Sequence, residues 1–282
     1  MIIERPVVNQ EYLADRLAVL DVEVRECRAE SVSNVRAAKL LPDLALSRLY
    51  HLLACVPPNW HYVENAAVEI LDAYEVLMHL VQSRRGFEDG GKGTGVAGFV
   101  DRIELGRPRR ASMTVSDFFA AFWTAVVLGD SRRLRLLAEA PRDVFVTAGV
   151  EVDEFLFKWM ETLQCYRRKD RRWVQLLADS IYLSDPARVE VASDDSLHYV
   201  LYPPIKLFYT LAAGTEAEFN FELEDALVRH HYYWTSENGR DSVPQGWASL
   251  PLTAISCMAL NKGYRIVPES LYLPLKMGLE GA

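Results

Sequence analysis

Apolar side chains recur at spacings of three and four residues along most of this chain, and that pattern constrains its fold more than any other feature. Such spacing places side chains on one face of an α-helix. Three stripes show it most clearly: Leu13, Leu17, Leu20, Val24 and Cys27; Val63, Ala67, Ile70, Tyr74, Leu77 and Val81; Phe155, Trp159, Leu163 and Tyr166. Further helices are predicted over residues 31–55, 115–128, 131–140, 170–183, 203–213, 216–235 and 247–262.

Short connections between these segments carry signals for helix ends. Gly129 stops one predicted helix, and Asp130 or Ser131 caps the next. Gly214 and Thr215 give the same two signals, a helix stop and a helix cap, before residues 216–235. Short connections predict antiparallel neighbours, so the sequence predicts an all-α fold, an irregular multi-helix array of antiparallel helix pairs.

Two features modify this helical pattern. Pro42 should kink or split the helix predicted over 31–55, because proline removes a backbone donor. Residues 86–114 lack helical spacing: a Gly-rich loop is followed by an alternation that is compatible with one small β-hairpin near 99–114. We therefore divide the chain into an N-terminal helical part (1–85), this segment (86–114) and a C-terminal helical part (115–282), packed as one compact unit.

Charge and composition narrow the classes of partner. The 282-residue chain has 31 basic and 39 acidic residues, a net charge of −8. An acidic surface disfavours nucleic acid and anionic membranes and favours a basic partner.

No apolar run reaches the roughly 20 residues that span a bilayer. The N-terminus does not resemble a secretory signal. The four cysteines are widely spaced, which suits a reducing cytoplasm, and no disulfide framework is expected.

The Gly-rich loop contains two near-matches to phosphate-binding motifs. Residues 86–94, GFEDGGKGT, approach GxxxxGK[ST], but Gly93 stands at the hydroxyl position. Residues 93–98, GTGVAG, fit GxGxxG. Both motifs need a buried strand before them and a helix after them. Here a helix precedes the loop and a strand-like stretch follows, so we expect a flexible loop and no bound cofactor.

Adjacent histidines stand in ALVRHHYYWTSEN, residues 226–238. On a helix over 216–235, His230 and Trp234 extend the apolar stripe, whereas His231 lies about 100° away around the axis. Metal pairs on helices use positions i and i+4, and neither histidine has a ligand at that spacing. An interior histidine with its polar atoms satisfied is therefore favoured. The alternative is a helical enzyme with a metal or acid–base site involving His230 or His231.

Other charged clusters give no stronger site. RRKDRRW, residues 167–173, is interpreted as a solvated junction between helices. Asp194, Asp195 and Glu190 are interpreted as surface acids. No nucleophile elbow is present. From these observations we assign no catalytic, cofactor-binding or metal residue. The missing motifs make an enzyme less favoured, although a catalytic triad can assemble from residues that are distant in the sequence.

Three stretches together resemble a known family: residues 122–141 (FWTAVVLGDSRRLRLLAEAP), 219–234 (FNFELEDALVRHHYYW) and 246–274 (GWASLPLTAISCMALNKGYRIVPESLYLP). The family is immunity protein 49, from bacterial polymorphic toxin systems. The positions that carry the resemblance are Gly129, Asp130, His231, Tyr233, Trp234, Gly263, Ser270, Tyr272 and Pro274.

The resemblance implies a cytoplasmic antidote that binds a cognate toxin domain and blocks it without catalysis. The acidic charge would suit a basic toxin domain. Exposed irregular segments often carry specificity, so the loops 86–98, 184–202 and 236–246 are the expected contact regions. A helical scaffold that binds peptides in a groove is a further alternative.

We expect the matched residues to act structurally. Gly263 should end a helix in the left-handed conformation, and Asp130 should cap one. Trp234 and Tyr272 should anchor the C-terminal part. Pro268 and Pro274 should fix an extended tail, which Leu271 and Leu273 would pack onto the body of the protein.

Overall fold

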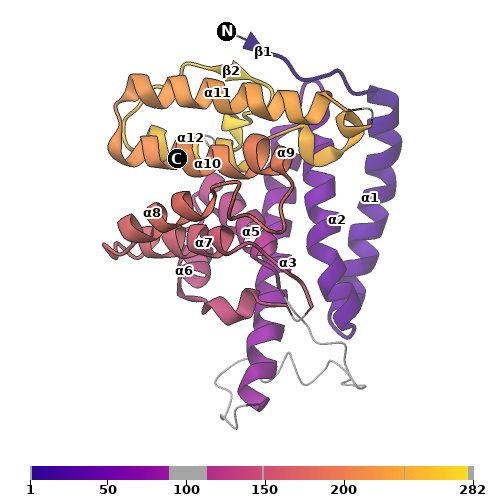
Figure 1. Ribbon diagram of the computed structural model, residues 1–282. Coiled ribbons are helices and arrows are strands. Elements are labelled where there is room, and N and C mark those ends of the chain that lie inside the picture. The colour runs from indigo at the N-terminus through magenta and orange to yellow at the C-terminus, as the bar shows by residue number, and fades with distance from the viewer. Residues whose placement is uncertain (1, 89–112, 148, 238, 279–282) are drawn as a thin grey trace. The chain divides into compact units, whose positions relative to one another are not determined.

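A computed structural model describes residues 2–88, 113–147, 149–237 and 239–278 (Figure 1). The protein is mainly α-helical, as predicted. The α-helices are α1 (Gln10–Ser31), α2 (Val35–Ala54), α3 (Trp60–Glu88), α5 (Val115–Val127), α6 (Ser131–Glu139), α7 (Glu154–Arg167), α8 (Trp173–Leu183), α9 (Asp194–Ser196), α10 (Tyr202–Ala213), α11 (Glu216–Thr235) and α12 (Leu250–Asn261). Short helical turns are η1 (Arg142–Phe145), the π-helical η2 (Leu197–Leu201), η3 (Arg240–Ser242), η4 (Pro244–Gly246) and η5 (Leu275–Gly278).

Two features of the backbone differ from the sequence-based expectation. Pro42 lies inside α2, which continues unbroken from Val35 to Ala54, so the predicted split is wrong. Helix α2 packs against both α1 and α3, and this packing offsets the roughly 3 kcal/mol cost of an internal proline. In addition, β1 (Ile2–Ile3) pairs in parallel with β2 (Glu269–Ser270), which no local pattern indicated.

The segment 86–114 lies mostly outside the described residues. Of the hairpin expected near 99–114, only Met113 and Thr114 are described, and neither is in a strand. The Gly-rich loop from residue 89 onward also lies outside. The division of the chain at this segment stays a prediction.

The chain forms two compact units. The N-terminal unit comprises Asn9–Ala121 and Ala140–Ala148, and the C-terminal unit comprises Met1–Val8, Phe122–Glu139 and Gly149–Ala282. Each unit therefore combines segments that are distant in the sequence.

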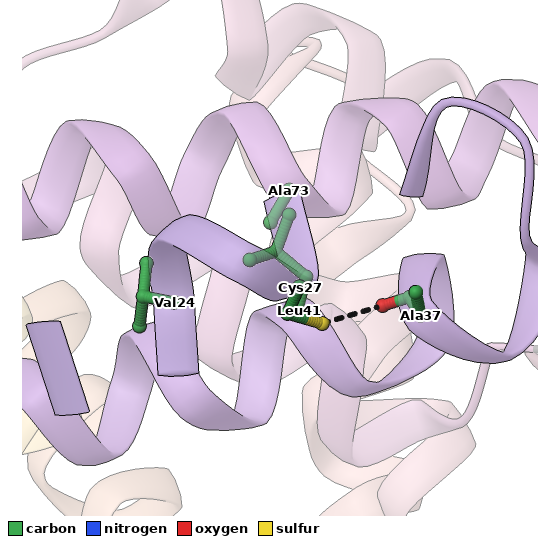
Figure 2. Packing of buried hydrophobic residues seen from close by; sticks show 5 residues of the cluster. All are labelled: Val24, Cys27, Ala37, Leu41 and Ala73. Carbon is green, nitrogen blue, oxygen red and sulfur yellow. Dashed lines mark hydrogen bonds between the residues drawn. The ribbon is translucent and has the colours of Figure 1, made fainter. Parts of the chain in front are cut away.

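Helices α1, α2 and α3 build the N-terminal unit, with α2 between the other two in sequence and in contact with both. Figure 2 shows part of their core, where the Cys27 thiol lies among small apolar side chains and donates to the Ala37 carbonyl oxygen at 3.2 Å. Burial raises the pKa of this thiol. A buried neutral cysteine packs as a small hydrophobic residue, so Cys27 serves the core of this unit.

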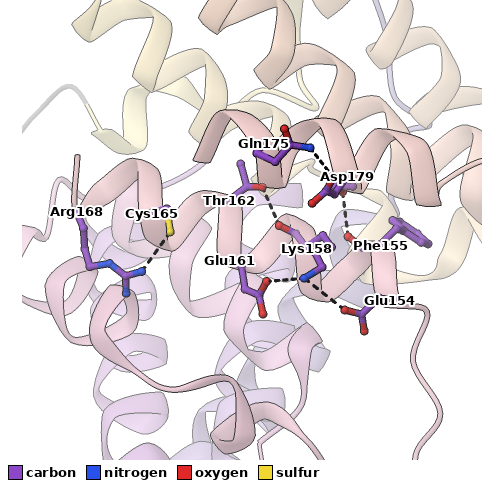
Figure 3. Close-up of polar contacts among 10 residues, drawn as sticks. Glu154, Phe155, Lys158, Glu161, Thr162, Cys165, Arg168, Gln175 and Asp179 are labelled. Carbon is purple, nitrogen blue, oxygen red and sulfur yellow. Dashed lines mark hydrogen bonds and ion pairs between the residues drawn. The ribbon is translucent and has the colours of Figure 1, made fainter. Parts of the chain in front are cut away.

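In the C-terminal unit, α7 and α8 form one antiparallel pair and α10 and α11 another. Figure 3 shows the polar contacts of the first pair, in which Lys158 lies 3.7 Å from Glu154 and 3.2 Å from Glu161. The buried Ser180 hydroxyl of α8 donates to the Phe155 carbonyl oxygen of α7 at 2.9 Å. That bond joins the two helices at a point from which water is excluded.

Helix ends in this unit follow the predicted signals. Gly129 and Gly263 end α5 and α12 with φ of +66° and +94°. In both, the next residue's N–H reaches back to a carbonyl of the last helical turn, which is the Schellman arrangement. Asp130 caps α6 by accepting from the Arg133 N–H at 2.9 Å. Gly214 ends α10 as expected, but in an extended conformation with φ of −96°.

The junction between α7 and α8 is the solvated turn predicted for RRKDRRW. Helix α7 ends in the same Schellman arrangement, but its left-handed residue is Lys169, with φ of +59°. Asp170 then accepts from the Arg172 backbone and side chain. The left-handed conformation costs a residue with a Cβ atom about 1–2 kcal/mol.

We therefore expect Lys169→Gly to raise the free energy of unfolding by about 0.5–1 kcal/mol, since the relief of strain outweighs the added freedom of the unfolded chain. Chemical denaturation measures the change. Arg171→Gly is the matched control, because Arg171 is an exposed basic residue of the same turn with negative φ. An equal gain from both substitutions, or a loss from Lys169→Gly, would show that strain at Lys169 is absent.

Candidate functional site

The adjacent histidines lie near the end of α11, whose start is firmly fixed. Thr215 and Glu218 form a capping box: the Thr215 N–H donates to the Glu218 carboxylate at 2.7 Å, and the Glu218 N–H donates to the Thr215 hydroxyl at 3.3 Å. The buried face of the helix carries Phe219, Leu223, Ala226, Leu227 and His230. This is the stripe predicted from the sequence, and it brings His230 into the interior.

His230 is a satisfied interior histidine. Its Nε2 atom lies 3.0 Å from the Gly246 carbonyl oxygen, which can only accept, so Nε2 carries the proton. Its ring meets the Tyr272 ring edge-on, with centroids 4.9 Å apart. Burial lowers the pKa of His230 to about 4, more than the bond to Gly246 raises it. The imidazole is therefore neutral near pH 7.

His231 has a different hydrogen-bond partner. Its Nδ1 atom lies 3.0 Å from the Tyr272 hydroxyl. Burial raises the pKa of Tyr272 to about 12, so this phenol keeps its proton near pH 7. The two histidines thus hold Gly246 and Tyr272 separately, and they do not converge on one ion. Among residues 2–88, 113–147, 149–237 and 239–278, no group of three or more His, Cys, Asp or Glu side chains could hold a metal.

Trp234 joins His230, His231 and Tyr272 in one patch of side chains. Its ring packs against the backbone of Gly246. A Cβ atom at Gly246 would lie only 2.6 Å from Cδ2 of the Trp234 ring, so no larger residue fits there without a shift. The same glycine accepts the His230 bond. Sequence analysis missed Gly246, because the close approach joins two segments that are separate in the sequence.

The family-like Ser270-x-Tyr272-x-Pro274 sequence is the other half of this patch. The Ser270 hydroxyl donates to the Ile3 carbonyl oxygen at 2.8 Å and accepts from the Tyr272 N–H at 3.2 Å. The Tyr272 carbonyl oxygen accepts from the Ser249 N–H at 2.8 Å. The Tyr272 side chain is 1% exposed. These residues therefore connect β1, the start of α12 and α11, all within the C-terminal unit.

Asn220 fixes the part of the tail that precedes Tyr272. Its side-chain amide donates to the Arg265 carbonyl oxygen at 2.9 Å and accepts from the Val267 N–H at 2.8 Å. Figure 1 shows the resulting course of the tail along α11. Leu273 is buried as expected, but Leu271 is 54% exposed, so the expectation that Leu271 packs the tail is wrong. Residues 271 and 272 form a turn, which the Leu273 N–H closes by donating to the Ser270 carbonyl oxygen at 3.1 Å. The tail is therefore not extended at this point, and Leu271 lies on the exposed side of the turn.

Two of the loops expected to make contacts are partly ordered into short helices. The carboxylate of Asp153, buried at the start of α7, accepts from the backbone N–H groups of Glu190, Val191 and Ala192 at 2.7–3.1 Å. The segment then forms α9 and η2, and Asp194 and Asp195 are exposed acids, as predicted. Residues 236–246 contain η3 and η4. The third loop, 86–98, lies outside the described residues except for its first three.

No helix in the described part of the chain is long and apolar enough to cross a membrane. The fold and the patch define a class: a helical protein whose motif residues hold its own tail and N-terminal strand in place. Over residues 76–277 the chain matches the family model described as Immunity protein 49, and it belongs to that family. No curated protein and no solved structure matches the chain.

Proposed function

We propose that this chain neutralises a cognate toxin domain in the cytoplasm by binding it and covering its active surface, without catalysis. Membership of the immunity protein family is the observation that carries this proposal. The net charge of −8 supports it, because complementary charge accelerates capture of a basic partner. A stable complex of this kind needs an interface of about 800 Å² on each partner.

The interior chemistry supports binding over catalysis. The His230 Nε2 proton is bonded to Gly246, and the His231 Nδ1 atom is bonded to the Tyr272 hydroxyl. A general acid or base must reach a substrate, whereas the His230 side chain is only 6% exposed. Both histidine rings pack against Tyr272, so they help to hold the tail in place.

Co-expression with the C-terminal domain of the large protein encoded by the adjacent gene tests the proposal. We expect the chain to restore growth to cells that produce this domain, and to co-purify with it as a stoichiometric complex. Failure of both rescue and complex formation, with that domain and with toxin domains from related loci, would contradict the proposal.

A further inference from the structure

The outer face of α11 carries a row of large apolar side chains. Phe221 is 74% exposed, Val228 41% and Tyr232 52%. Spacings of seven and four residues place the three on one side of the helix, opposite the buried stripe that contains Leu223 and Leu227. We call Phe221, Val228 and Tyr232 the α11 outer stripe. Single apolar residues scattered over a protein surface are normal. An aligned row that includes two aromatic rings is instead typical of an interaction site.

The stripe continues onto the neighbouring turn. The Tyr199 ring, from η2, lies beside the Tyr232 ring with centroids 4.9 Å apart. Arg229 of α11 donates to the His198 carbonyl oxygen of the same turn at 3.4 Å. The aromatic end of the stripe thus adjoins the segment 184–202, one of the expected contact regions.

Acidic groups flank the stripe. Glu218, Glu224 and Asp225 stand three or four residues from Phe221, so they lie beside it on the helix. Asp225 pairs with Arg229 at 2.7 Å. The first ten residues of α11 hold five acidic side chains and no basic one. Glu222 is buried and pairs with Lys206 at 2.7 Å, so the other four acidic side chains supply the surface charge. The surface is therefore apolar along its centre and negative along its edges.

This charge pattern selects among the partners that could cover the stripe. A second copy of the chain would bring like charges together across the interface, which disfavours a symmetric dimer. An amphipathic helix face with spaced aromatic anchors fits an apolar groove. Resting on the proposed function, we infer that the α11 outer stripe docks into the cognate toxin domain, in an apolar groove rimmed by lysine and arginine side chains.

The test compares the binding affinities of variants on the α11 outer stripe with that of a variant at an equally exposed tyrosine elsewhere. The toxin domain encoded by the adjacent gene is titrated with the wild-type chain, with Phe221→Ala, with Tyr232→Ala and with Val228→Glu. Central aromatic residues of an interface are those whose truncation costs most, so we expect each alanine variant to weaken binding about 30-fold or more. Val228→Glu places a charge inside the apolar groove and should weaken binding at least as much.

Tyr62→Ala on α3 is the matched control, since Tyr62 is 53% exposed and Tyr232 is 52% exposed. It should leave the affinity unchanged within about twofold. Thermal melting of each variant confirms folding, which these exposed substitutions should preserve. Association of the wild-type chain should also slow as salt is raised.

The outcomes separate the two proposals. A wild-type chain that binds tightly, with stripe variants that bind equally well, would overturn the docking inference and leave the proposed function standing. A wild-type chain that does not bind the domain would count against the proposed function itself. A chain that dimerises alone, and becomes monomeric in the stripe variants, would assign the stripe to a second copy and overturn the inference.

Discussion

Replacing Tyr272 with alanine is expected to lower the free energy of unfolding by about 3–5 kcal/mol, the cost of removing a large buried aromatic side chain. The Tyr272 ring is fully buried, with the His230 and His231 rings 4.9 and 6.0 Å away. Its loss would leave a cavity and would remove the partner of His231 Nδ1. Because the tail meets β1 and α12 at this point, loosening it should weaken several contacts together.

Urea denaturation followed by circular dichroism measures this change. Leu271→Ala is the control, because Leu271 is the exposed neighbour on the same tail and its truncation should cost no more than about 0.5 kcal/mol. A chain that ends at Tyr264 removes the whole tail and should melt at a lower temperature. An unchanged midpoint in that shortened chain would contradict the structural role of the tail.

Acid is expected to destabilise the protein through His230, by up to about 3 kcal/mol. Burial holds the pKa of His230 at about 4 in the folded state, below the ordinary value of 6.5. As the pH falls below about 6.5, the unfolded chain takes up the proton first, and unfolding becomes more favourable. This stability is fully present above pH 6.5, and it is lost progressively as the pH falls towards about 4.

His230→Gln isolates this contribution, because glutamine can donate to the Gly246 carbonyl oxygen and does not titrate. Unfolding free energies of both proteins are measured across the range between the two pKa values. The wild-type curve should fall more steeply with acid than the variant curve. Parallel curves would mean that the pKa of His230 is the same in the folded and unfolded states, and would contradict this prediction.

Local signals in the sequence predicted most helices of this fold. Helix α11 is the clearest case, because its cap, its first-turn acids and its apolar spacing all lie within twenty residues. Asp130 and Gly263 were predictable for the same reason: a helix end is decided by a few adjacent residues. The family resemblance similarly placed Tyr272 and Trp234 as anchors.

Contacts between distant segments could not be predicted in this way. The β1–β2 pairing joins residues 2–3 to 269–270, and neither segment has a strand pattern of its own. Asn220 looked like an ordinary polar residue in a helix, yet it holds the tail at Arg265 and Val267. The role of Gly246 depends on a ring packed against its backbone. Pro42 was misjudged because packing of α2 on both sides outweighs its local cost.

Whether one chain inactivates one toxin molecule is the most direct test of the proposed function. A large excess of the toxin domain from the adjacent gene is incubated with the chain, and the bound fraction, the intact mass and the remaining toxicity are measured. We expect toxicity to fall only in proportion to the chain added, with the mass of the toxin domain unchanged. Loss of toxicity far beyond that proportion, or an altered toxin mass, would show catalysis and contradict inhibition by binding.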